Sequence, residues 1–148
     1  MTRATPQFCT FYVDDLYFGV DVLQVQEVIR GLEATRVPLA PPAVHGLINL
    51  RGQIVTAIDL RTRLGRAPRS GGVGPMDVVV RTEDGAISLW VDEIGDVIQT
   101  DDDSFERTPE TMPPAAKDLI RGVYKLSDRL LLVLDRACAP NLEAVGSK

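Results

Sequence analysis

The chain has 148 residues, of which 45% are hydrophobic and 25% are charged, and its net charge is -5 at pH 7. This length suits one compact unit with a substantial core, and the composition is that of a globular domain rather than a disordered segment. The negative charge argues against nucleic acid as a partner, because phosphate backbones attract basic surfaces. No apolar run approaches the ~18 residues of a membrane span, and the N-terminus has no apolar run of the secretory type. We therefore expect a cytoplasmic protein.

Four strand hairpins are predicted from short apolar runs that are separated by turn residues. In chain order they cover residues 8–13 with 16–20, residues 49–58, residues 76–82 with 86–91, and residues 122–126 with 130–134. Arg51 and Gly52 form the tip of the second hairpin, where Gly52 supplies the positive φ that tight turns require. Residues 130–134 are apolar at every position, so we expect this strand to face core on both sides.

The helical signals in the sequence are brief. Asp21 can cap a helix over residues 22–29, in which apolar residues recur at helical spacing. Asp59 can cap a single turn that ends at Gly65. Because neither segment is long enough to organise a fold, we predict a mainly β protein with a few short helices.

An internal repeat relates two parts of the chain. Residues 46–59 align without a gap on residues 122–135, and glycine, apolar positions and the closing aspartate coincide. We interpret the paired glycines, Gly46 and Gly122, as meeting a requirement of the backbone rather than as binding a ligand.

The repeat predicts two halves at residues 7–66 and 75–138 within a single domain that spans residues 1–148. Residues 65–75 are rich in glycine and proline and form the expected joint. Short antiparallel strands close most economically into a small barrel, because closure removes exposed strand edges. We therefore predict two packed five-stranded barrels with a groove between them, and strand exchange between the halves stays open.

Charge is unevenly spread along the chain, because several arginines fall close together while acidic residues gather at 14–33 and 92–110. The arginines are Arg51, Arg61, Arg63, Arg66 and Arg69. We expect basic and acidic residues to lie in separate regions of the molecule, an arrangement that suits docking to another protein.

The sequence contains no pattern for catalysis, cofactor binding or metal binding. His45 is the only histidine and has no other metal-ligating residue at ligand spacing, so we interpret it as a surface or hydrogen-bonded residue. The acidic run 101–103 is not followed by the glycine and glutamate of a calcium loop, and residues 72–74 lack the third glycine of a dinucleotide loop. Trp90 is expected in a strand, either within the core or as an interface anchor. We expect no enzyme, no cofactor and no metal.

Several short motifs occur in a fixed order along most of the chain. They are LYFGVD at 16–21, VQEVI at 25–29, VP at 37–38, GLINLRG at 46–52, IDLR at 58–61 and LWVDEIGDV at 89–97, followed by the repeat segment at 122–135. Each motif alone is weak, but the ordered set from Phe8 to about Leu134 resembles the CheW family of bacterial chemotaxis coupling proteins.

The resemblance implies a fold of two five-stranded, SH3-like barrels, in agreement with the repeat. It also implies a function, since similar proteins are non-enzymatic adaptors that bridge the cytoplasmic tips of chemoreceptors to the histidine kinase CheA. We therefore expect a cytoplasmic adaptor that is recruited to membrane-associated receptor arrays. Its expected partners are a CheA-like kinase and the receptor tip, with no nucleic acid and no insertion into the membrane.

Five residues are expected to contact these partners. The Asn-Leu-Arg-Gly motif implies, by resemblance, that Arg51 belongs to the receptor-binding surface, and Val25 and Glu27 are assigned to it on the same terms. For Arg51 the alternative is a solvated turn residue, and for Val25 it is a buried valine. Pro109 and Glu110 lie in a long polar loop and are marked as kinase contacts, because scaffolds often place contacts on such loops.

Two alternative functions stay open. The first is a CheW-like scaffold that serves another chemosensory-type pathway, such as surface motility or gene regulation. The second is a small-molecule or enzyme site in the groove between the barrels, supported only by the tendency of such grooves to bind ligands.

Overall fold

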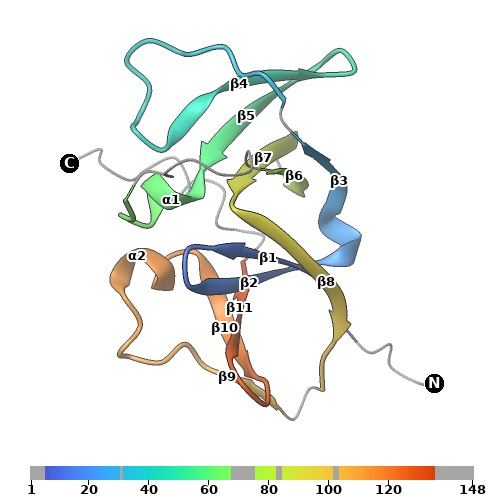
Figure 1. Ribbon diagram of the computed structural model, residues 1–148, viewed down its shortest axis with the longest axis vertical. Coiled ribbons are helices and arrows are strands. Elements are labelled where there is room, and N and C mark those ends of the chain that lie inside the picture. Colours follow the sequence, from blue (N-terminus) through green and yellow to red (C-terminus); the bar gives the residue numbers. More distant parts are fainter. Residues whose placement is uncertain (1–5, 31, 68–75, 83–84, 102–103, 136–148) are drawn as a thin grey trace.

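Two β-sheets stacked along the long axis of the molecule make up most of the computed structural model (Figure 1). The structure describes residues 6–30, 32–67, 76–82, 85–101 and 104–135. In chain order the strands are β1 (Gln7–Val13), β2 (Leu16–Asp21), β3 (Val25–Arg30), β4 (Val44–Leu50), β5 (Gln53–Asp59), β6 (Met76–Thr82), β7 (Gly85–Val91), β8 (Glu93–Gln99), β9 (Phe105–Glu106), β10 (Ile120–Lys125) and β11 (Leu130–Leu134). The short helices are the 3-10 helix η1 (Val22–Gln24), α1 (Leu60–Arg63) and α2 (Pro114–Lys117). The mainly β prediction is confirmed.

The sheets hold five and six strands, and we name them the upper and the lower sheet after their positions in Figure 1. The upper sheet has the order β3-β6-β7-β5-β4, and the lower sheet has the order β8-β1-β2-β11-β10-β9. The predicted pair of strand units is confirmed. The lower sheet differs from the expectation by one strand, because the two-residue β9 pairs with the edge of β10.

The repeated segments fold into the same hairpin in the two sheets. In the upper sheet Gly46 pairs with Ala57, and in the lower sheet Gly122 pairs with Val133. The register shifts immediately before the glycine in both hairpins. The sequence alignment of the two segments is therefore also a structural equivalence.

The remaining strands repeat as well, with residue numbers shifted by 69. The pairing of Phe8 with Asp21 between β1 and β2 corresponds to the pairing of Asp77 with Trp90 between β6 and β7. Each of these hairpins pairs with strands from the other part of the chain, because β2 joins β11 and β7 joins β5, both in parallel. The proposed half boundaries at 75 and 138 lie outside the described residues and stay a prediction.

The largest apolar cluster lies between the sheets and takes residues from both of them. Phe11 and Phe18 enter it from the lower sheet, and Ile58 and Leu89 enter it from the upper sheet. Because the two sheets share this core, they bury each other's apolar faces and pack as one unit.

Strand β11 confirms the prediction that its two faces are both buried. Leu132 and Leu134 belong to the shared cluster, whereas Leu131 and Val133 belong to a second cluster within the lower sheet. Leu130, at the start of the strand, is partly exposed. An all-apolar sequence is therefore explained by core on both sides.

The predicted helix over residues 22–29 is wrong. Only η1 is helical, with Asp21 accepting a hydrogen bond from the backbone N–H of Leu23 at 2.9 Å as its cap. The chain then becomes strand β3, which pairs with β6. Its β-branched residues favour extended backbone, and the cross-strand partners outweigh the weak helical spacing. The capped turn after Asp59 is confirmed as α1, with Gly65 following at φ +72°.

The same steric constraint requires glycine at positions 46 and 122. A Cβ atom at Gly46 would lie 2.6 Å from the carbonyl oxygen of Thr35, and one at Gly122 would lie 2.8 Å from that of Glu106. Backbone of a neighbouring segment, the bridge at Thr35 for Gly46 and strand β9 for Gly122, thus lies directly against each glycine and leaves no room for a side chain. The prediction of a backbone role is confirmed.

Candidate functional site

The tip of the β4–β5 hairpin presents a cation at the edge of the upper sheet. Arg51 and Gly52 both have positive φ, +53° and +88°, as a two-residue hairpin turn requires. The side chain of Asn49 accepts a hydrogen bond from the N–H of Gly52 at 2.8 Å and fixes the turn. The Arg51 side chain is 74% exposed. The tip is therefore rigid in its backbone while its guanidinium faces solvent.

The guanidinium of Arg51 is not a free cation, because it forms an ion pair with Glu27 of β3. Glu27 is only 16% exposed, so the pair anchors the tip to a partly buried carboxylate. The pKa of Arg51 is raised above its ordinary value, first by this hydrogen bond and then by the charge of Glu27. The structure thus brings together two of the three residues that were assigned to receptor binding.

Apolar and amide side chains lie beside this pair. Ile54, three residues after Arg51, is 62% exposed. Gln26 of β3 faces Gln53 of the hairpin across 3.5 Å. We name the set Gln26, Glu27, Arg51, Gln53 and Ile54 the hairpin-tip surface. It combines a charged pair with an exposed aliphatic group, a composition that suits protein docking.

Val25 lies at the start of β3 and is partly buried against the shared core. Its backbone carbonyl accepts a hydrogen bond from Arg81 at 3.5 Å. Of the three predicted receptor contacts, Val25 is therefore the one that the structure ties most closely to the core.

Pro109 and Glu110 lie in the loop between β9 and α2, which belongs to the lower sheet. The carbonyl of Pro109 accepts a hydrogen bond from the N–H of Met112 at 3.1 Å, so the loop contains a turn, and Glu110 is exposed. In Figure 1 this loop and the hairpin tip lie toward opposite ends of the long axis. The structure does not bring the two sets of predicted contacts together.

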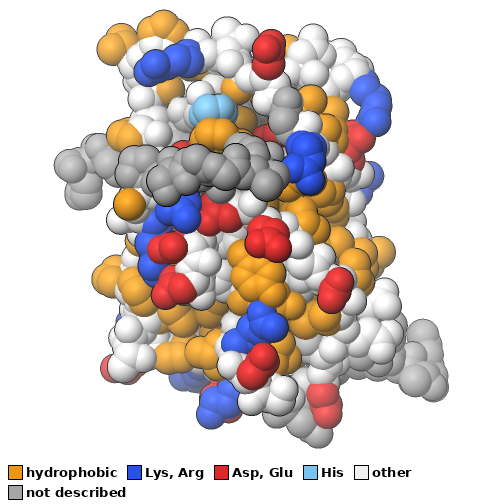
Figure 2. Space-filling model, viewed as in Figure 1, with side chains coloured by type: hydrophobic (Ala, Val, Ile, Leu, Met, Phe, Trp, Pro, Cys, Tyr) orange, Lys and Arg blue, Asp and Glu red, His pale blue; other side chains and the backbone are white. Residues whose placement is uncertain are grey.

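The arginine-rich part of the sequence does not form a free basic patch. Arg61 forms an ion pair with Asp92, and Arg66 forms one with Asp14. Arg63 is almost fully buried. Figure 2 shows basic and acidic side chains interspersed on the face it presents. Arg61 and Arg66 therefore do not form the separate basic region that the sequence predicts, because carboxylates from distant parts of the chain pair with them. Arg69 lies outside the described residues.

Trp90 and His45 form a stacked pair that the sequence analysis missed. Their ring centroids are 3.9 Å apart with an interplanar angle of 23°. Both residues are half-buried, so Trp90 is not a core residue, and His45 is a packing partner as well as a surface residue. The two residues are 45 positions apart, and the sequence between them carries no signal for this contact, which arises because β4, β5 and β7 are neighbours in the upper sheet.

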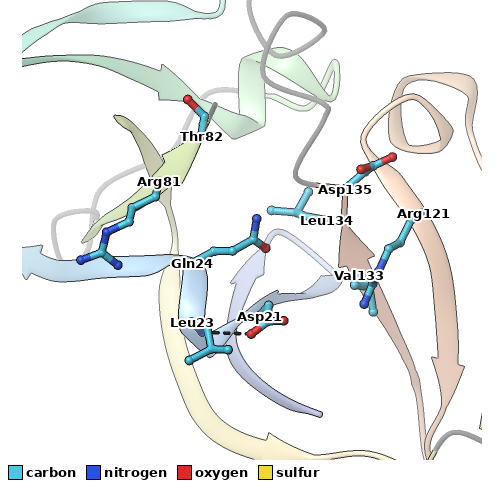
Figure 3. Close-up of a pocket in the computed structure, with 9 residues that line it drawn as sticks. All are labelled: Asp21, Leu23, Gln24, Arg81, Thr82, Arg121, Val133, Leu134 and Asp135. Atoms are coloured by element: carbon cyan, nitrogen blue, oxygen red, sulfur yellow. Dashed lines mark hydrogen bonds between the residues drawn. The ribbon is translucent and has the colours of Figure 1, made fainter. Parts of the chain in front are cut away.

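A cavity of about 440 Å³ opens where the two sheets meet (Figure 3). Its lining residues are Asp21, Leu23, Gln24, Arg81, Thr82, Arg121, Val133, Leu134 and Asp135. The charges are balanced, and Asp21 is already engaged as the cap of η1. Among the described residues, no group of three or more histidines, cysteines or carboxylates is arranged to hold a metal ion. No helix in these ranges is long and apolar enough to cross a membrane.

Comparisons with known proteins agree with this architecture. A family model described as a CheW-like domain matches residues 7–137. A probable chemotaxis protein CheW of Rhizobium etli is 27% identical over 148 residues, covering 100% of this chain and 92% of the relative. The chemotaxis protein CheW of Bacillus subtilis is 30% identical over 125 residues, covering 84% of this chain and 80% of the relative.

A solved structure is also similar in fold. The scaffolding protein TtCheW from Thermoanaerobacter tengcongensis superposes with a TM-score of 0.80 at 27% sequence identity, covering 89% of this chain and 90% of that chain. The family model alone spans far more than half of the sequence. The chain therefore belongs to the CheW family of chemotaxis scaffold proteins.

Proposed function

We propose that this protein is a non-enzymatic adaptor that couples chemoreceptors to a CheA-type histidine kinase in bacterial chemotaxis. Membership of the CheW family and the chemotaxis names of its relatives support this role. The hairpin-tip surface and the β9–α2 loop lie on different sheets. This separation supports an adaptor that holds two partners at once.

The hairpin-tip surface is the proposed receptor contact. The observation that carries this proposal is that Arg51 is mostly exposed and yet held by Glu27 at a rigid turn. A cation that is already oriented loses little side-chain freedom when a partner binds, so more of the contact energy appears as affinity. Exposed Ile54 supplies apolar area beside it. Val25 takes part through its exposed portion and by holding the start of β3.

The β9–α2 loop is the proposed kinase contact, through Pro109 and Glu110. The proline restricts the backbone of the loop, and the turn to Met112 fixes its shape. Because Glu110 is exposed on the lower sheet, a kinase docked there leaves the hairpin tip free for a receptor.

A direct binding experiment tests the receptor contact. The variant Arg51→Glu reverses the charge at the tip and also repels Glu27, so we expect affinity for a receptor cytoplasmic fragment to fall about tenfold or more. Arg36→Glu is the matched control, because Arg36 is also exposed in the upper sheet region but lies outside the hairpin-tip surface. Equal loss of affinity in the two variants would show that net charge, not the tip, governs binding.

The kinase contact is tested in the same format with Glu110→Lys and a purified CheA-type kinase. We expect weaker kinase binding with receptor binding unchanged. The identity of the kinase that binds also separates chemotaxis from another chemosensory-type pathway. Unchanged kinase affinity in Glu110→Lys and in a Pro109→Ala variant would remove this loop from the interface.

A further inference from the structure

A cluster of charged residues ties the two sheets together on one side of their junction. Arg61 of α1 donates from Nε to both carboxylate oxygens of Asp92 at 3.0 and 3.1 Å, and from a terminal nitrogen to the carbonyl of Ala67 at 2.8 Å. Arg61 and Asp92 are both less than one-fifth exposed. This geometry orients the guanidinium by several hydrogen bonds at once.

The cluster extends to the turn between β1 and β2 in the lower sheet. Asp92 accepts a hydrogen bond from the N–H of Asp14 at 2.7 Å, and Arg66 forms ion pairs with Asp14 at 3.0 Å and Asp15 at 2.9 Å. We name Asp14, Asp15, Arg61, Arg66 and Asp92 the ion-pair clamp. It joins α1 and its following residues, which extend from the upper sheet, to the lower-sheet turn.

Helix α1 reaches the lower sheet a second time through Arg63. This side chain is 3% exposed and donates a hydrogen bond to the carbonyl of Ala115 in α2 at 3.4 Å. One short helix thus holds the lower sheet through two arginines, which point to the β1–β2 turn and to α2. Both contacts lie on the same side of the junction.

On the opposite side of the junction, the residues that the structure describes line a cavity. The shift of 69 residues that relates β1 and β2 to β6 and β7 places Leu23 at the position of Asp92. Leu23 is 82% exposed and lines the cavity of about 440 Å³ between the sheets. Figure 3 shows Gln24 and Arg81 on one side of this cavity and Leu134, Asp135 and Arg121 on the other.

The shared core and the ion-pair clamp hold the two sheets together in different ways. The shared apolar core favours contact between the sheets, but apolar attraction has no preferred direction. Hydrogen-bonded ion pairs have a preferred direction and distance. Among the described residues, the ion-pair clamp supplies oriented polar contacts that join the two sheets on its side of the junction.

We infer that the ion-pair clamp positions the hairpin-tip surface relative to the β9–α2 loop, and that transmission between receptor and kinase depends on this fixed orientation. The inference rests on the proposed function. Arg61 and Asp92 act as positioning residues and touch neither partner. Loss of the clamp therefore impairs transmission more than it impairs binding of either partner alone.

The test uses the full chain with the variants Arg61→Gln and Asp92→Asn, which remove charge and nearly preserve size. Lys125→Gln is the matched control, because it removes an exposed ion pair with Glu106, 3.3 Å long, that lies within the lower sheet. Receptor affinity and kinase affinity are measured separately, followed by receptor-dependent kinase activity with all three proteins. We expect each affinity to stay within about twofold of wild type while receptor control of the kinase falls about fivefold or more.

Orientation is measured independently of any partner. Spin labels are placed at two exposed positions, by Arg36→Cys in the loop before β4 and Ser127→Cys in the turn between β10 and β11, in a background with Cys9→Ser and Cys138→Ser. Pulsed electron paramagnetic resonance then gives the distribution of distances between the labels. We expect a broader distribution in Arg61→Gln, and also in wild type at 1 M salt, where screening acts within about 3 Å.

The outcomes separate the two proposals. A broader distance distribution in a protein that binds neither receptor nor kinase would support the clamp and reject the adaptor role. Unchanged distances in Arg61→Gln and at high salt would overturn the clamp while leaving the adaptor role intact. A parallel loss of binary affinity and transmission would also overturn it, because the clamp residues would then be partner contacts. If Arg61→Gln does not fold, Arg66→Gln and the salt series on wild type provide the same readouts.

Discussion

The two repeated hairpins share a backbone frame but use the arginines at their tips differently. In the upper sheet Arg51 extends into solvent and is held by Glu27 of an edge strand. In the lower sheet Arg129 lies over the ring of Tyr17 at 4.5 Å and donates a hydrogen bond to the hydroxyl of Tyr12 at 2.6 Å. The repeated hairpin backbone therefore sets the position of each tip. The neighbouring side chains determine whether the arginine faces solvent or packs on its own sheet.

Substitutions at the two repeated glycines are expected to lower the free energy of unfolding most. Gly122→Ala and Gly46→Ala each push a Cβ atom into a backbone carbonyl, so we expect each to lower the free energy of unfolding by about 2–4 kcal/mol. Gly65→Ala is the comparator, because its Cβ would meet nothing within 4 Å and only its positive φ is unfavourable. We expect it to cost about 1 kcal/mol. Chemical denaturation measures all three, and equal costs would remove the steric explanation.

The two sheets differ in one buried position, which is expected to have a smaller effect on stability. Asp77 is buried in the upper sheet and accepts a hydrogen bond from Ser88 at 2.8 Å, whereas the equivalent position in the lower sheet is the buried Phe8. Burial raises the pKa of Asp77 above its ordinary value of 3.8, against the opposing hydrogen bonds from Ser88 and Leu32. The folded protein therefore binds this proton more tightly than the unfolded chain does.

The sign of the pH dependence follows from this raised pKa. The contribution of Asp77 to stability is fully present below its unfolded pKa and is lost as pH rises through its folded pKa. Asp77→Asn keeps an acceptor for Ser88 but does not ionise, so we expect a flatter stability profile above about pH 4. Denaturation at a series of pH values measures this slope. An unchanged slope in the variant would show that other groups cause it.

Removing the arginine of each hairpin tip separately is expected to affect stability and receptor binding in opposite ways. Arg129→Ala loses a stacking contact with Tyr17 and a hydrogen bond to Tyr12, so we expect a lower Tm with receptor affinity unchanged. Thermal unfolding and receptor binding are measured on the same sample. Loss of receptor affinity in this variant would place a partner contact on the lower tip as well.

Arg51→Ala is expected to have the smallest effect on stability. Its side chain is largely exposed, and exposed ion pairs contribute little to folding. We therefore expect a Tm close to that of wild type together with weaker receptor binding, the reverse of the pattern for Arg129→Ala. A Tm drop as large as that of Arg129→Ala would show that Arg51 is a structural residue.

The sequence predicted the features that depend on neighbouring residues. Turn residues and alternating apolar runs located all four hairpins, and the repeat predicted their equivalence. The segment 22–29 was assigned to helix because its apolar spacing fits a helix, whereas pairing with β6 made most of it a strand. Local periodicity cannot reveal which strand lies beside a short segment.

The side-chain contacts of the candidate site were beyond sequence reasoning. Arg51 and Glu27 were assigned separately, and their ion pair depends on a hairpin reaching back across 24 residues to an edge strand. The ion-pair clamp joins residues that are up to 78 positions apart. Such contacts follow from the way the sheets pack, which no spacing in the sequence encodes.

Reconstitution of receptor, CheA-type kinase and this protein tests the adaptor role most directly. Kinase activity is measured with and without receptor stimulus, using wild type, Arg51→Glu and Arg36→Glu. We expect receptor control of the kinase to require the wild-type chain, to persist in Arg36→Glu and to be lost in Arg51→Glu. Equal receptor control in the absence of the chain, or full control with Arg51→Glu, would contradict the adaptor role or its assigned surface, respectively.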